Sequence, residues 1–408
     1  MKVLHIATGF PIDFAGGITN YVRSLATAQA EQGIDVSVLS GKPKSRDLYK
    51  FKLIEYSSKE VMPFSLKIKR DEMGTHILNR LLTQENYDII HFHMNLDFGY
   101  DFFENFVNYN IKYIISLHDY YYFCPRITMM DYTDNYCGGP QKEKCEKCIG
   151  VLDQIDTIRR GARKLGVELP RWQSEKVSMR NDVIAKFFER AERVIAVSSR
   201  VEEIYKSFYY EARYLTNIIG NDSALNYLDK KLPSDKIRIS FLGTLSKHKG
   251  AELLKIFLKG NKRQDVEFHF YGRAEKGYDK ELEKLGLILH GPYKSSDISN
   301  IMLSTDIGIA LPVWEDNGPQ VVMEFINNRV PVIATRMGGI PDIVGSSGGY
   351  LFDYQSQDQI KSALEWLEKL SRETIENMSR NIETLKTPDQ HAAEILQIYG
   401  EVSGEDNK

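Results

Sequence analysis

Apolar and polar positions follow two alternating periods along the first half of the chain. An apolar run at Val3 to Ala7 precedes a loop with Gly16-Gly17, and the next pattern predicts an amphipathic helix from Ile18 to about Gln32. After Gly33, a second apolar run at Asp35 to Leu39 completes a strand–helix–strand unit. Further strands are predicted at Ile89 to Phe92, Tyr113 to Leu117 and Arg193 to Val197, with helices at Phe64 to Leu82 and Val177 to Glu192. This alternation predicts a parallel, doubly wound sheet.

The same alternation begins again after about residue 230. Strands are predicted at Ile237 to Phe241, Val266 to Tyr271, Leu287 to His290, Ile307 to Leu311 and Val332 to Thr335, with helices such as Ala251 to Leu258 and Pro319 to Asn328. The stretch from Glu211 to Ser234 contains turn-forming residues and is interpreted as a linker. We therefore expect two Rossmann-like α/β domains, residues 1–205 and 206–387. A C-terminal helix, about 388–405, is expected to pack back on the first domain.

Composition narrows the class of protein. The 408 residues are 42% hydrophobic and 27% charged, as in a globular enzyme, and the formal net charge of -3 gives no reason to expect nucleic acid as a partner. The N-terminus lacks the apolar core of a signal peptide, and no apolar run has transmembrane length. Four cysteines without an export signal make structural disulfides unexpected. A cytoplasmic location is the expectation.

Open parallel sheets bind their ligands at the carboxyl ends of the strands, and two facing sheets would share one cleft. The loops after strands are therefore the places to look for chemistry. Gly16-Gly17 follows the first strand and precedes a helix, so its amides could approach a phosphate; a plain tight turn is the alternative. The loop from Gly243 to Gly250 has the same layout, and its Lys247 and Lys249 could reach anionic oxygens or form a solvated basic turn.

The segment from Pro312 to Glu324 is the most informative. It follows a strand, and Pro319 suits the first turn of a helix with Asn317 or Gly318 as its cap. The amides of Gln320 and Val321 would then be free to face a phosphate. Asp316 and Glu324 are two carboxylates that could address one bound molecule, and a carboxylate can accept from both hydroxyls of a ribose. A favourable helix dipole is the alternative explanation for Asp316 and explains Glu324 poorly.

A histidine and four cysteines also follow strands. His118-Asp119 comes after the strand at Tyr113 to Leu117, so the imidazole could contact a sugar hydroxyl, with a structural role as the alternative. His91 and His93 also follow a strand pattern, and one of them is expected only to pack. The cysteines, spaced C-x12-C-x7-C-x2-C, are compatible with a structural zinc site or with reduced thiols in a loop: Cys124, Cys137, Cys145 and Cys148.

A cationic amphipathic stretch follows the cysteines. Its basic residues are interleaved with apolar ones, which favours contact with an anionic membrane surface or a lipid-linked acceptor, or else a solvated helix face. The residues are Leu152, Ile155, Ile158, Arg159, Arg160, Arg163, Lys164, Leu165, Arg171 and Trp172. An earlier basic group, Lys67, Lys69 and Arg70, would strengthen the membrane hypothesis if the three shared a face.

Together these motifs resemble the retaining GT-B glycosyltransferases of family 4, from Met1 to about Asp353. The resemblance is carried by the glycine loops and by four stretches: His118-Asp-Tyr-Tyr-Tyr-Phe-Cys-Pro-Arg126, Val194-Ile-Ala-Val-Ser198, Trp314 to Thr335, and Gly338-Gly-Ile-Pro-Asp342. It implies two Rossmann-like domains whose parallel sheets face an interdomain cleft. The first domain would bind the acceptor and the second a nucleotide-sugar donor, a UDP- or GDP-sugar, without a required metal.

The resemblance also implies roles for individual residues. Lys249 would bind the diphosphate, Glu324 the ribose and His118 the donor sugar, with His118, Lys249 and Asp316 as the catalytic set. The donor site would further include Gly16, Gly17, Lys247, Asn317, Gly318, Pro319, Gln320 and Val321. Two positions depart from the family pattern: Asp316 replaces the usual glutamate, and Thr244 stands where an arginine often shares phosphate binding.

The function expected from this resemblance is transfer of a hexose-type sugar to a glycan or lipid-linked acceptor in bacterial surface polysaccharide or glycoconjugate synthesis. Peripheral contact with the inner membrane face is part of this hypothesis. Two alternatives remain: a nucleotide-sugar epimerase of the same fold, which would need acid–base carboxylates at the sugar ring, and a catalytically silent sugar-binding subunit.

Overall fold

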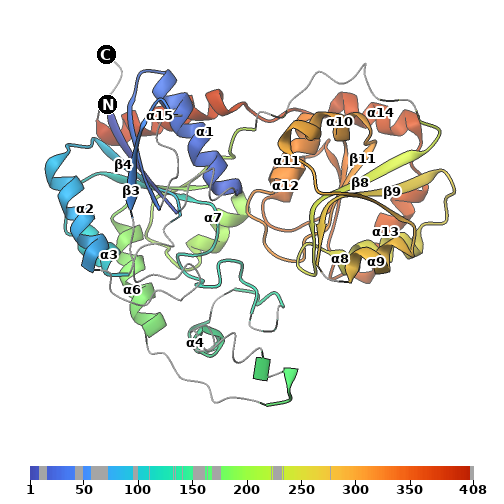
Figure 1. Ribbon diagram of the computed structural model, residues 1–408, viewed down its shortest axis with the longest axis horizontal. Helices are drawn as coiled ribbons and strands as arrows, with labels where there is room; N and C mark the ends of the chain where they lie inside the picture. The colour runs from blue at the N-terminus through green and yellow to red at the C-terminus, as the bar shows by residue number, and fades with distance from the viewer. Residues whose placement is uncertain are drawn as a thin grey trace. The chain divides into compact units, whose positions relative to one another are not determined.

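The computed structural model describes most of the chain in two compact units. The described residues are 1–8, 16–41, 49–56, 72–94, 100–109, 111–131, 133, 135–139, 141–149, 161–162, 164–167, 176–221, 223, 232, 234–275 and 277–404. One unit comprises Met1–Asn217 with Pro388–Lys408, and the other comprises Ile218–Thr387 (Figure 1). Each is an α/β domain around a parallel sheet, which confirms the predicted fold class.

The first unit contains a seven-stranded sheet in the order β3-β2-β1-β4-β5-β6-β7. Every pair is parallel, and the central strands are buried along their length, as apolar runs without a polar face require. The strands are β1 Lys2–Ala7, β2 Asp35–Gly41, β3 Lys52–Tyr56, β4 Ile89–Phe92, β5 Tyr113–Leu117, β6 Arg193–Ala196 and β7 Tyr214–Thr216.

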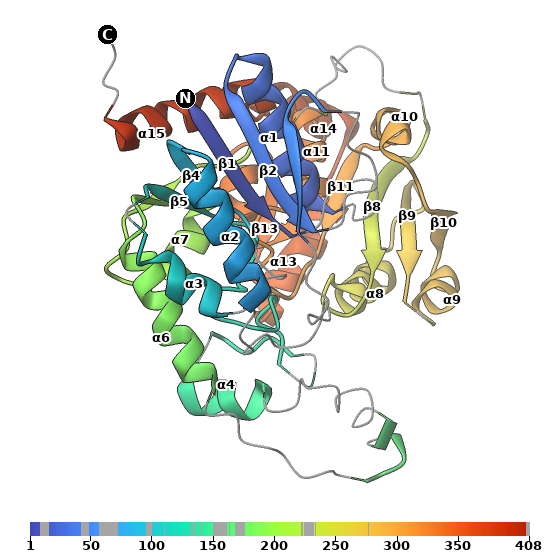
Figure 2. The ribbon, with the colours of Figure 1, turned by 60° about the vertical axis from the view of Figure 1, so that its left-hand side comes forward.

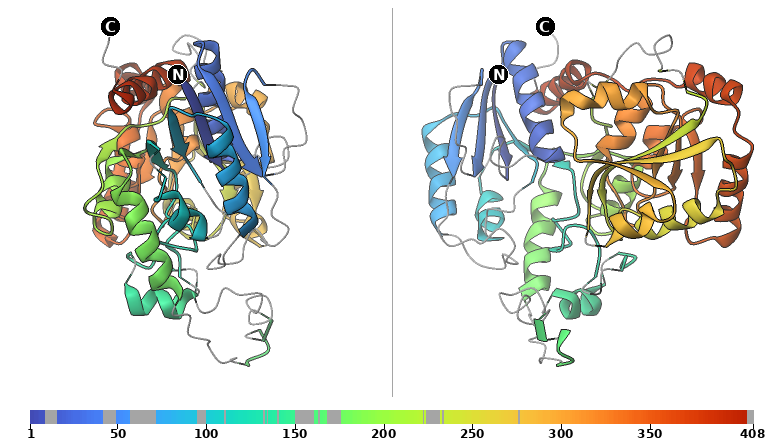
Figure 3. Two further views of the ribbon diagram at one scale, coloured as in Figure 1. Left: turned by 90° about the vertical axis from the view of Figure 1, so that its left-hand side faces the viewer. Right: turned by 45° about the vertical axis from the view of Figure 1, so that its right-hand side comes forward.

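Helices cover both faces of this sheet (Figures 2 and 3). On one face, α1 buries Val22, Leu25 and Ala28 against the strands, and α15 closes the same core with Ile395 and Tyr399. Thus the end of the chain belongs to the first unit, and α15 lies alongside α1. The helices of this unit are α1 Gly17–Glu31, α2 Glu72–Gln84, α3 Tyr100–Phe106, α4 Lys142–Ile149, α6 Lys176–Glu189, α7 Ser199–Lys206 and α15 Pro388–Ser403.

The second unit repeats this plan with six parallel strands in the order β10-β9-β8-β11-β12-β13. Its strands are β8 Ile237–Leu245, β9 Val266–Ala274, β10 Leu287–Gly291, β11 Ile307–Ala310, β12 Val332–Thr335 and β13 Gly349–Phe352. The helices α8, α9 and α13 share one hydrophobic core with the sheet, and α11 and α12 lie on the other face (Figure 1).

The helices of the second unit are α8 Ala251–Gly260, α9 Tyr278–Glu283, α10 Ile298–Leu303, α11 Gln320–Asn327, α12 Ile340–Val344, α13 Gln357–Glu368 and α14 Arg372–Asn381, with a 3-10 turn at Ser295–Asp297. Across the described part of both units, no helix combines the length and apolar character needed to cross a bilayer.

Several predicted elements need correction. The interpretation of Glu211 to Ser234 as a linker overlooked β7, a three-residue edge strand whose Leu215 is exposed and which therefore has no apolar signature. The strands β3 and β13 were also missed, because edge strands mix polar and apolar residues. The helix predicted from Phe64 is described only from Glu72 onward, since residues 57–71 lie outside the described part of the chain.

Both sheets reverse their strand order next to the first strand of the unit. The reversal lies between β1 and β4 in the first unit and between β8 and β11 in the second. At such a point the loops after the two adjacent strands diverge to opposite faces, which leaves a crevice where ligands bind. Gly16 follows β1, and Lys249 and Glu324 follow β8 and β11, whereas His118 follows β5, the neighbour of β4.

Candidate active site

In the second unit, the loops after β8 and β11 are packed together by glycine. Gly250 has φ +90°, and a Cβ atom there would lie 1.9 Å from the carbonyl oxygen of Leu311. The amide of Val313 donates to the carbonyl of His248 at 2.9 Å. Only glycine allows this backbone approach, so the basic loop lies directly against the segment that begins at Pro312.

Lys249 is held at the centre of this arrangement. Its Nζ atom is 2.5 Å from Asp316 Oδ2 and lies over the Trp314 ring, 5.1 Å from the centroid. The aspartate side chain is 12% exposed and the lysine side chain 35%. Lys247 is exposed. Lys249 is therefore fixed in place by the fold, through an ion pair and a cation–π contact.

A second pair of glycines fixes the carboxylate side of this ion pair. The amide of Gly339 donates to the Asp316 carbonyl at 2.8 Å, and the amide of Gly338 donates to Glu315 Oε2 at 2.8 Å. Gly338 has φ +55°, and a Cβ atom there would lie 2.0 Å from the Asp316 carbonyl oxygen. Glu315, which is buried, lies inside the Pro312 to Glu324 segment but was not singled out, because its partner is a backbone amide 23 positions away.

The start of α11 corrects one prediction. Pro319 precedes the helix as its N-cap, with φ -66° and ψ 108°, and neither Asn317 nor Gly318 caps it. The Pro319 carbonyl accepts from the amides of Val322 and Met323. The amides of Gln320 and Val321 are the first two of the helix, and they have no backbone acceptor among the described residues. The helix thus begins one residue later than predicted, and the amides of Gln320 and Val321 are its first two; that they bind an anion stays a prediction.

Several buried polar atoms next to this helix end have no hydrogen-bond partner in the described part of the chain. The side-chain oxygen and nitrogen of Asn317, which is 4% exposed, and the indole N–H of Trp314 make no hydrogen bond to described residues. Such atoms are rare in folded proteins because each costs free energy when desolvated. Their place beside Lys249 fits a polar ligand that hydrogen-bonds with them.

Glu324 lies in the second turn of α11, as predicted, and is partly buried. Tyr293, in the loop after β10, is close enough to interact with it electrostatically. Burial is the main cause that raises the pKa of the Tyr293 hydroxyl, and the Glu324 charge raises it further. Tyr293 is a further candidate that could not be found from the sequence, because a lone tyrosine after a strand is indistinguishable from a packing residue.

In the first unit, Gly16 is the N-cap of α1, and Gly17 is its first residue. The Gly16 amide donates to Thr19 Oγ1 at 2.9 Å. Gly16 has extended backbone, and a Cβ atom would meet only Thr19 Oγ1, at 3.9 Å. Neither conformation nor packing within the described residues therefore requires glycine here, whereas close approach of a ligand would.

His118 lies at the carboxyl end of β5, near the same helix. The Tyr21 ring of α1 is 4.6 Å from its ring, and burial lowers the pKa of His118 to about 3, helped by His391. The neutral imidazole can therefore donate and accept one hydrogen bond each. Burial raises the pKa of the adjacent Asp119 to about 7, opposed by the Tyr121 amide. Gly16, Gly17 and His118 thus belong to one unit, and Lys249 to Glu324 to the other.

A buried arginine holds the loop that carries His118 in place. Arg180 of α6 is 2% exposed and donates to the carbonyls of Tyr121 and Tyr122 at 2.6 and 3.0 Å. Its guanidinium lies 4.7 Å from the Tyr121 ring. A buried arginine that satisfies backbone carbonyls fixes the loop, and the sequence did not single it out.

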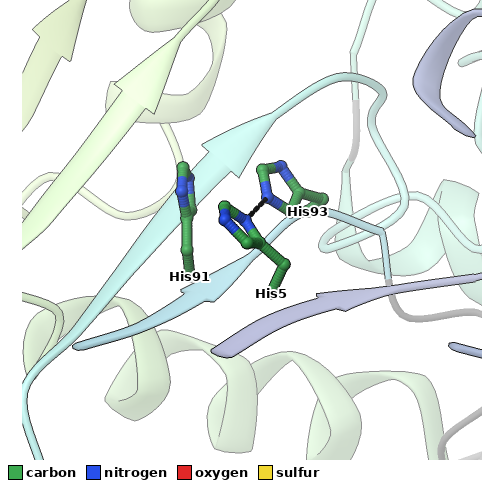
Figure 4. A group of neighbouring side chains, drawn as sticks. All are labelled: His5, His91 and His93. Atoms are coloured by element: carbon green, nitrogen blue, oxygen red, sulfur yellow. Dashed lines mark hydrogen bonds between the residues drawn. The ribbon is translucent and has the colours of Figure 1, made fainter. Parts of the chain in front are cut away.

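Three buried histidines lie next to one another, near the loop that carries His118. His5 of β1 and His91 and His93, at the end of β4, bring ring nitrogens within 4.8 Å of one another (Figure 4). All three are buried, and burial is the main cause that lowers their pKa values. The prediction that one of His91 and His93 only packs is not the whole account, because both belong to a hydrogen-bonded network.

The four cysteines have free thiols and are neighbours in space. Burial raises the pKa of Cys124 to about 12, and the thiols of Cys137 and Cys145 contribute to this rise. Cys137 and Cys145 interact in the same way with Cys148. Among the described residues, however, no three sulfur atoms come within 4.8 Å of one another. Zinc binding therefore stays a prediction.

That prediction has a direct measurement. We expect one equivalent of zinc per chain after purification without added metal, since four thiolates form a tetrahedral site. Inductively coupled plasma mass spectrometry of the native protein and of Cys145→Ser would check it. Zinc below a tenth of an equivalent in the native protein would contradict the prediction.

Most of the cationic stretch lies outside the described residues, as do Lys67, Lys69 and Arg70. The described part includes Leu165 and Val167, whose side chains are 82% and 52% exposed. Exposed apolar residues beside basic ones are compatible with the membrane hypothesis, which stays a prediction.

Two family models match the chain and together span most of it. The model "Glycosyltransferase Family 4" matches residues 15–214, and "Glycosyl transferases group 1" matches residues 227–384. The chain is a member of the GT-B glycosyltransferases. Within this glycosyltransferase, each model falls mainly on one of the two structural units.

Curated relatives match parts of the glycosyltransferase chain. TuaC of Bacillus subtilis, a glycosyltransferase assigned to teichuronic acid biosynthesis, is 26% identical over 181 residues, 42% of this chain and 45% of its own length. The sulfoquinovosyl transferase SQD2 of Arabidopsis thaliana is 29% identical over 127 residues, 29% of this chain and 24% of its own. These matches span less than half of each relative.

Solved structures match this glycosyltransferase over nearly its whole length. Sucrose-phosphate synthase from Thermosynechococcus elongatus has a TM-score of 0.67 at 16% identity, covering 99% of this chain and 100% of its own. Anabaena HepE, in complex with UDP, has a TM-score of 0.65 at 14% identity, covering 98% and 100%. WaaG, of lipopolysaccharide biosynthesis, has a TM-score of 0.61 at 14% identity, covering 97% and 99%. At these identities the likeness shows the fold.

Proposed function

We propose that the protein transfers a hexose-type sugar from a UDP- or GDP-sugar to a glycan or lipid-linked acceptor, with retention of anomeric configuration. The observation that carries the proposal is Lys249, a cation held by Asp316 and Trp314 beside the free amides at the start of α11. A fixed cation beside backbone N–H groups suits the negative charges of a diphosphate. That relatives include enzymes of surface polysaccharides, and that HepE is seen with UDP, supports the substrate class.

The chemistry follows from charge. Cleavage of the sugar–phosphate bond leaves negative charge on the diphosphate and positive charge on the sugar ring. The Lys249 ammonium and the amides of Gln320 and Val321 would stabilise the diphosphate, because they are oriented before the reaction and need little reorganisation. Fixed cation and dipoles together supply the charge that a metal ion would otherwise provide, so the proposal needs no bound metal. His118 would contact the sugar, and Glu324 would accept from the ribose hydroxyls.

The acceptor and the cellular place of the reaction are the remaining parts of the proposal. The first unit, with Gly16, His118 and the exposed Leu165 and Val167, would bind an acceptor that is anchored in the inner membrane face. We propose peripheral contact with that face from the cytoplasmic side. Incubating the protein with radiolabelled donors and with the same glycan acceptor, free or lipid-linked in vesicles, separates the acceptor classes.

Donor binding gives the sharpest test of this function. At a donor concentration 100 times Kd, binding stabilises the protein by about 2.7 kcal/mol, which raises its melting temperature by roughly 5–10 °C. In Glu324→Ala, we expect affinity for the cognate nucleotide sugar to fall about 10- to 100-fold, because a charged hydrogen-bond acceptor is lost. Titration by thermal shift and calorimetry measures both.

The matched control is Glu376→Ala on α14, a glutamate of the same unit that forms only an exposed ion pair with Arg380. It should bind the donor as the native protein does. If Glu324→Ala and Glu376→Ala bound the donor with equal affinity, the proposed role of Glu324 in the donor site would be wrong. Epimerised donor would support the epimerase instead, and donor binding without any turnover would support a silent subunit.

A further inference from the structure

A chain of hydrogen bonds runs from the core of the first unit to His118. Gln29 Oε1 is 2.8 Å from His5 Nε2. His5 Nδ1 is 2.9 Å from His93 Nε2 (Figure 4). The last link joins His93 Nδ1 to His118 Nε2 at 3.2 Å. Gln29, His5 and His93 are each at most 1% exposed, so water does not compete for these bonds.

The hydrogen-bond chain has a donor-to-acceptor direction because each imidazole ring in it is neutral. Burial lowers the pKa of His5 to about 4 and that of His118 to about 3, and lowers that of His93. A neutral imidazole has one N–H and one acceptor nitrogen, whereas an amide oxygen only accepts. With the Gln29 amide oxygen toward His5, as the structure places it, His5 carries its proton on Nε2. Its Nδ1 then accepts from His93 Nε2, and His93 Nδ1 in turn accepts from His118 Nε2.

We propose that Gln29, His5 and His93 are positioning residues that fix His118 as the Nε2–H tautomer. The lone pair of His118 Nδ1 is then available to the ligand, and it accepts a hydrogen bond from a hydroxyl of the donor sugar. Among the described residues no partner occupies that nitrogen. The inference rests on the proposed function for the sugar contact, whereas the tautomer depends on the protein alone. It makes His118 selective for a hydroxyl that can donate.

The neighbouring ring of His91 shows why the cluster is a relay and not a metal site. His91 Nδ1 is 2.6 Å from the Tyr399 hydroxyl, and His91 Nε2 is 2.7 Å from Ser116 Oγ. With these bonds, all six ring nitrogens of the three buried histidines have a hydrogen-bond partner. A metal ion would have to displace several of them, and buried polar groups left unpaired are costly.

The test is to measure tautomers directly. The ring ¹⁵N chemical shifts of histidine distinguish a protonated from an unprotonated nitrogen, and the signals of His118 are assigned by their loss in His118→Gln. In the native protein without ligand, we expect the proton on Nε2. In Gln29→Met the acceptor is removed, and an Nε2–H of His5 would be buried without a partner. We therefore expect the whole chain to reverse, with at least a tenfold excess of the Nδ1–H form of His118.

Gln29→Glu is the matched control, because it keeps an oxygen acceptor at the same place and should keep the native tautomer. Gln29→Met should also lower kcat with the cognate donor about tenfold or more, while Gln29→Glu retains most activity. A native His118 protonated on Nδ1, an unchanged tautomer in Gln29→Met, or a reversed tautomer with native kcat would each overturn the proposal. Zinc bound in stoichiometric amount at His5 and His93 would overturn it too.

The two proposals fail in distinguishable ways. A native protein that binds and turns over no nucleotide sugar contradicts the proposed function, whereas the tautomer measurement still decides the relay. A melting temperature within a few degrees of native for Gln29→Met shows that the comparison is made on folded protein.

Discussion

Replacing Lys249 with methionine should lower kcat/KM for the cognate donor about 100- to 1,000-fold. The variant removes the cation that pairs with Asp316 and lies over the Trp314 ring, the group proposed to bind the diphosphate. Loss of a preoriented group that stabilises developing negative charge has effects of this size. Lys247→Met is the control, because Lys247 is exposed and should lose far less. Steady-state kinetics and donor titration of both variants measure the difference.

The same substitution leaves the largely buried Asp316 carboxylate without its cation, and we expect it to cost about 1–2 kcal/mol, since the lysine is partly exposed. Adding Asp316→Asn removes the uncompensated charge. The double variant should therefore regain thermal stability but not activity. Recovery of activity together with stability would show that Lys249 acts only through folding, and would contradict its role at the diphosphate.

Replacing Gly338 with alanine should destabilise the second unit by about 3–5 kcal/mol and lower its melting temperature by roughly 6–20 °C. The new Cβ atom would lie 2.0 Å from the Asp316 carbonyl oxygen, at a backbone conformation with φ +55°. The segment from Glu315 to Asp316 would have to move, which would also break the Lys249 ion pair. Donor affinity should fall with stability.

Gly345→Ala separates the two causes. Gly345 has φ +59°, close to that of Gly338, but a Cβ atom there meets nothing within 4 Å. With ψ -152° its backbone lies in a region that other residues avoid, so alanine should cost about 1–3 kcal/mol, less than at Gly338, with native donor binding. If the two variants melted alike in differential scanning calorimetry, the close contact between Gly338 and Asp316 would not exist in solution.

The sequence predicted the two parallel-sheet domains because a parallel sheet is buried on both faces. Its central strands, such as β1 and β4, are therefore continuous apolar runs that stand out from the amphipathic helices between them. Edge strands such as β7 lack a continuous apolar run, because one side of each is solvated, and they are therefore harder to predict. For the same reason, loops after central strands were sound places to seek Lys249, Glu324 and His118.

Helix caps and buried charges were harder to predict. Pro319 was expected inside the helix because proline suits a first turn, but its ψ angle places it just before that turn. Glu315 and Arg180 were not singled out, and each became a candidate only when its partners were seen: the Gly338 amide for Glu315, and the carbonyls of Tyr121 and Tyr122 for Arg180. The role of a side chain that contacts a distant segment can be recognised only when the structure places that segment beside it.

By itself, the sequence determined the alternation of elements, the identity of the charged groups and the loops that carry them, because hydrophobic period and glycine or proline position are local properties. Only the tertiary structure decided that Lys249 is paired with Asp316, and that His5, His93 and His118 form one line to Gln29. Those contacts depend on strand order: β1 pairs with β4, and β4 with β5, which brings together histidines up to 113 positions apart in sequence. The proposed tautomer of His118 is a consequence of that pairing.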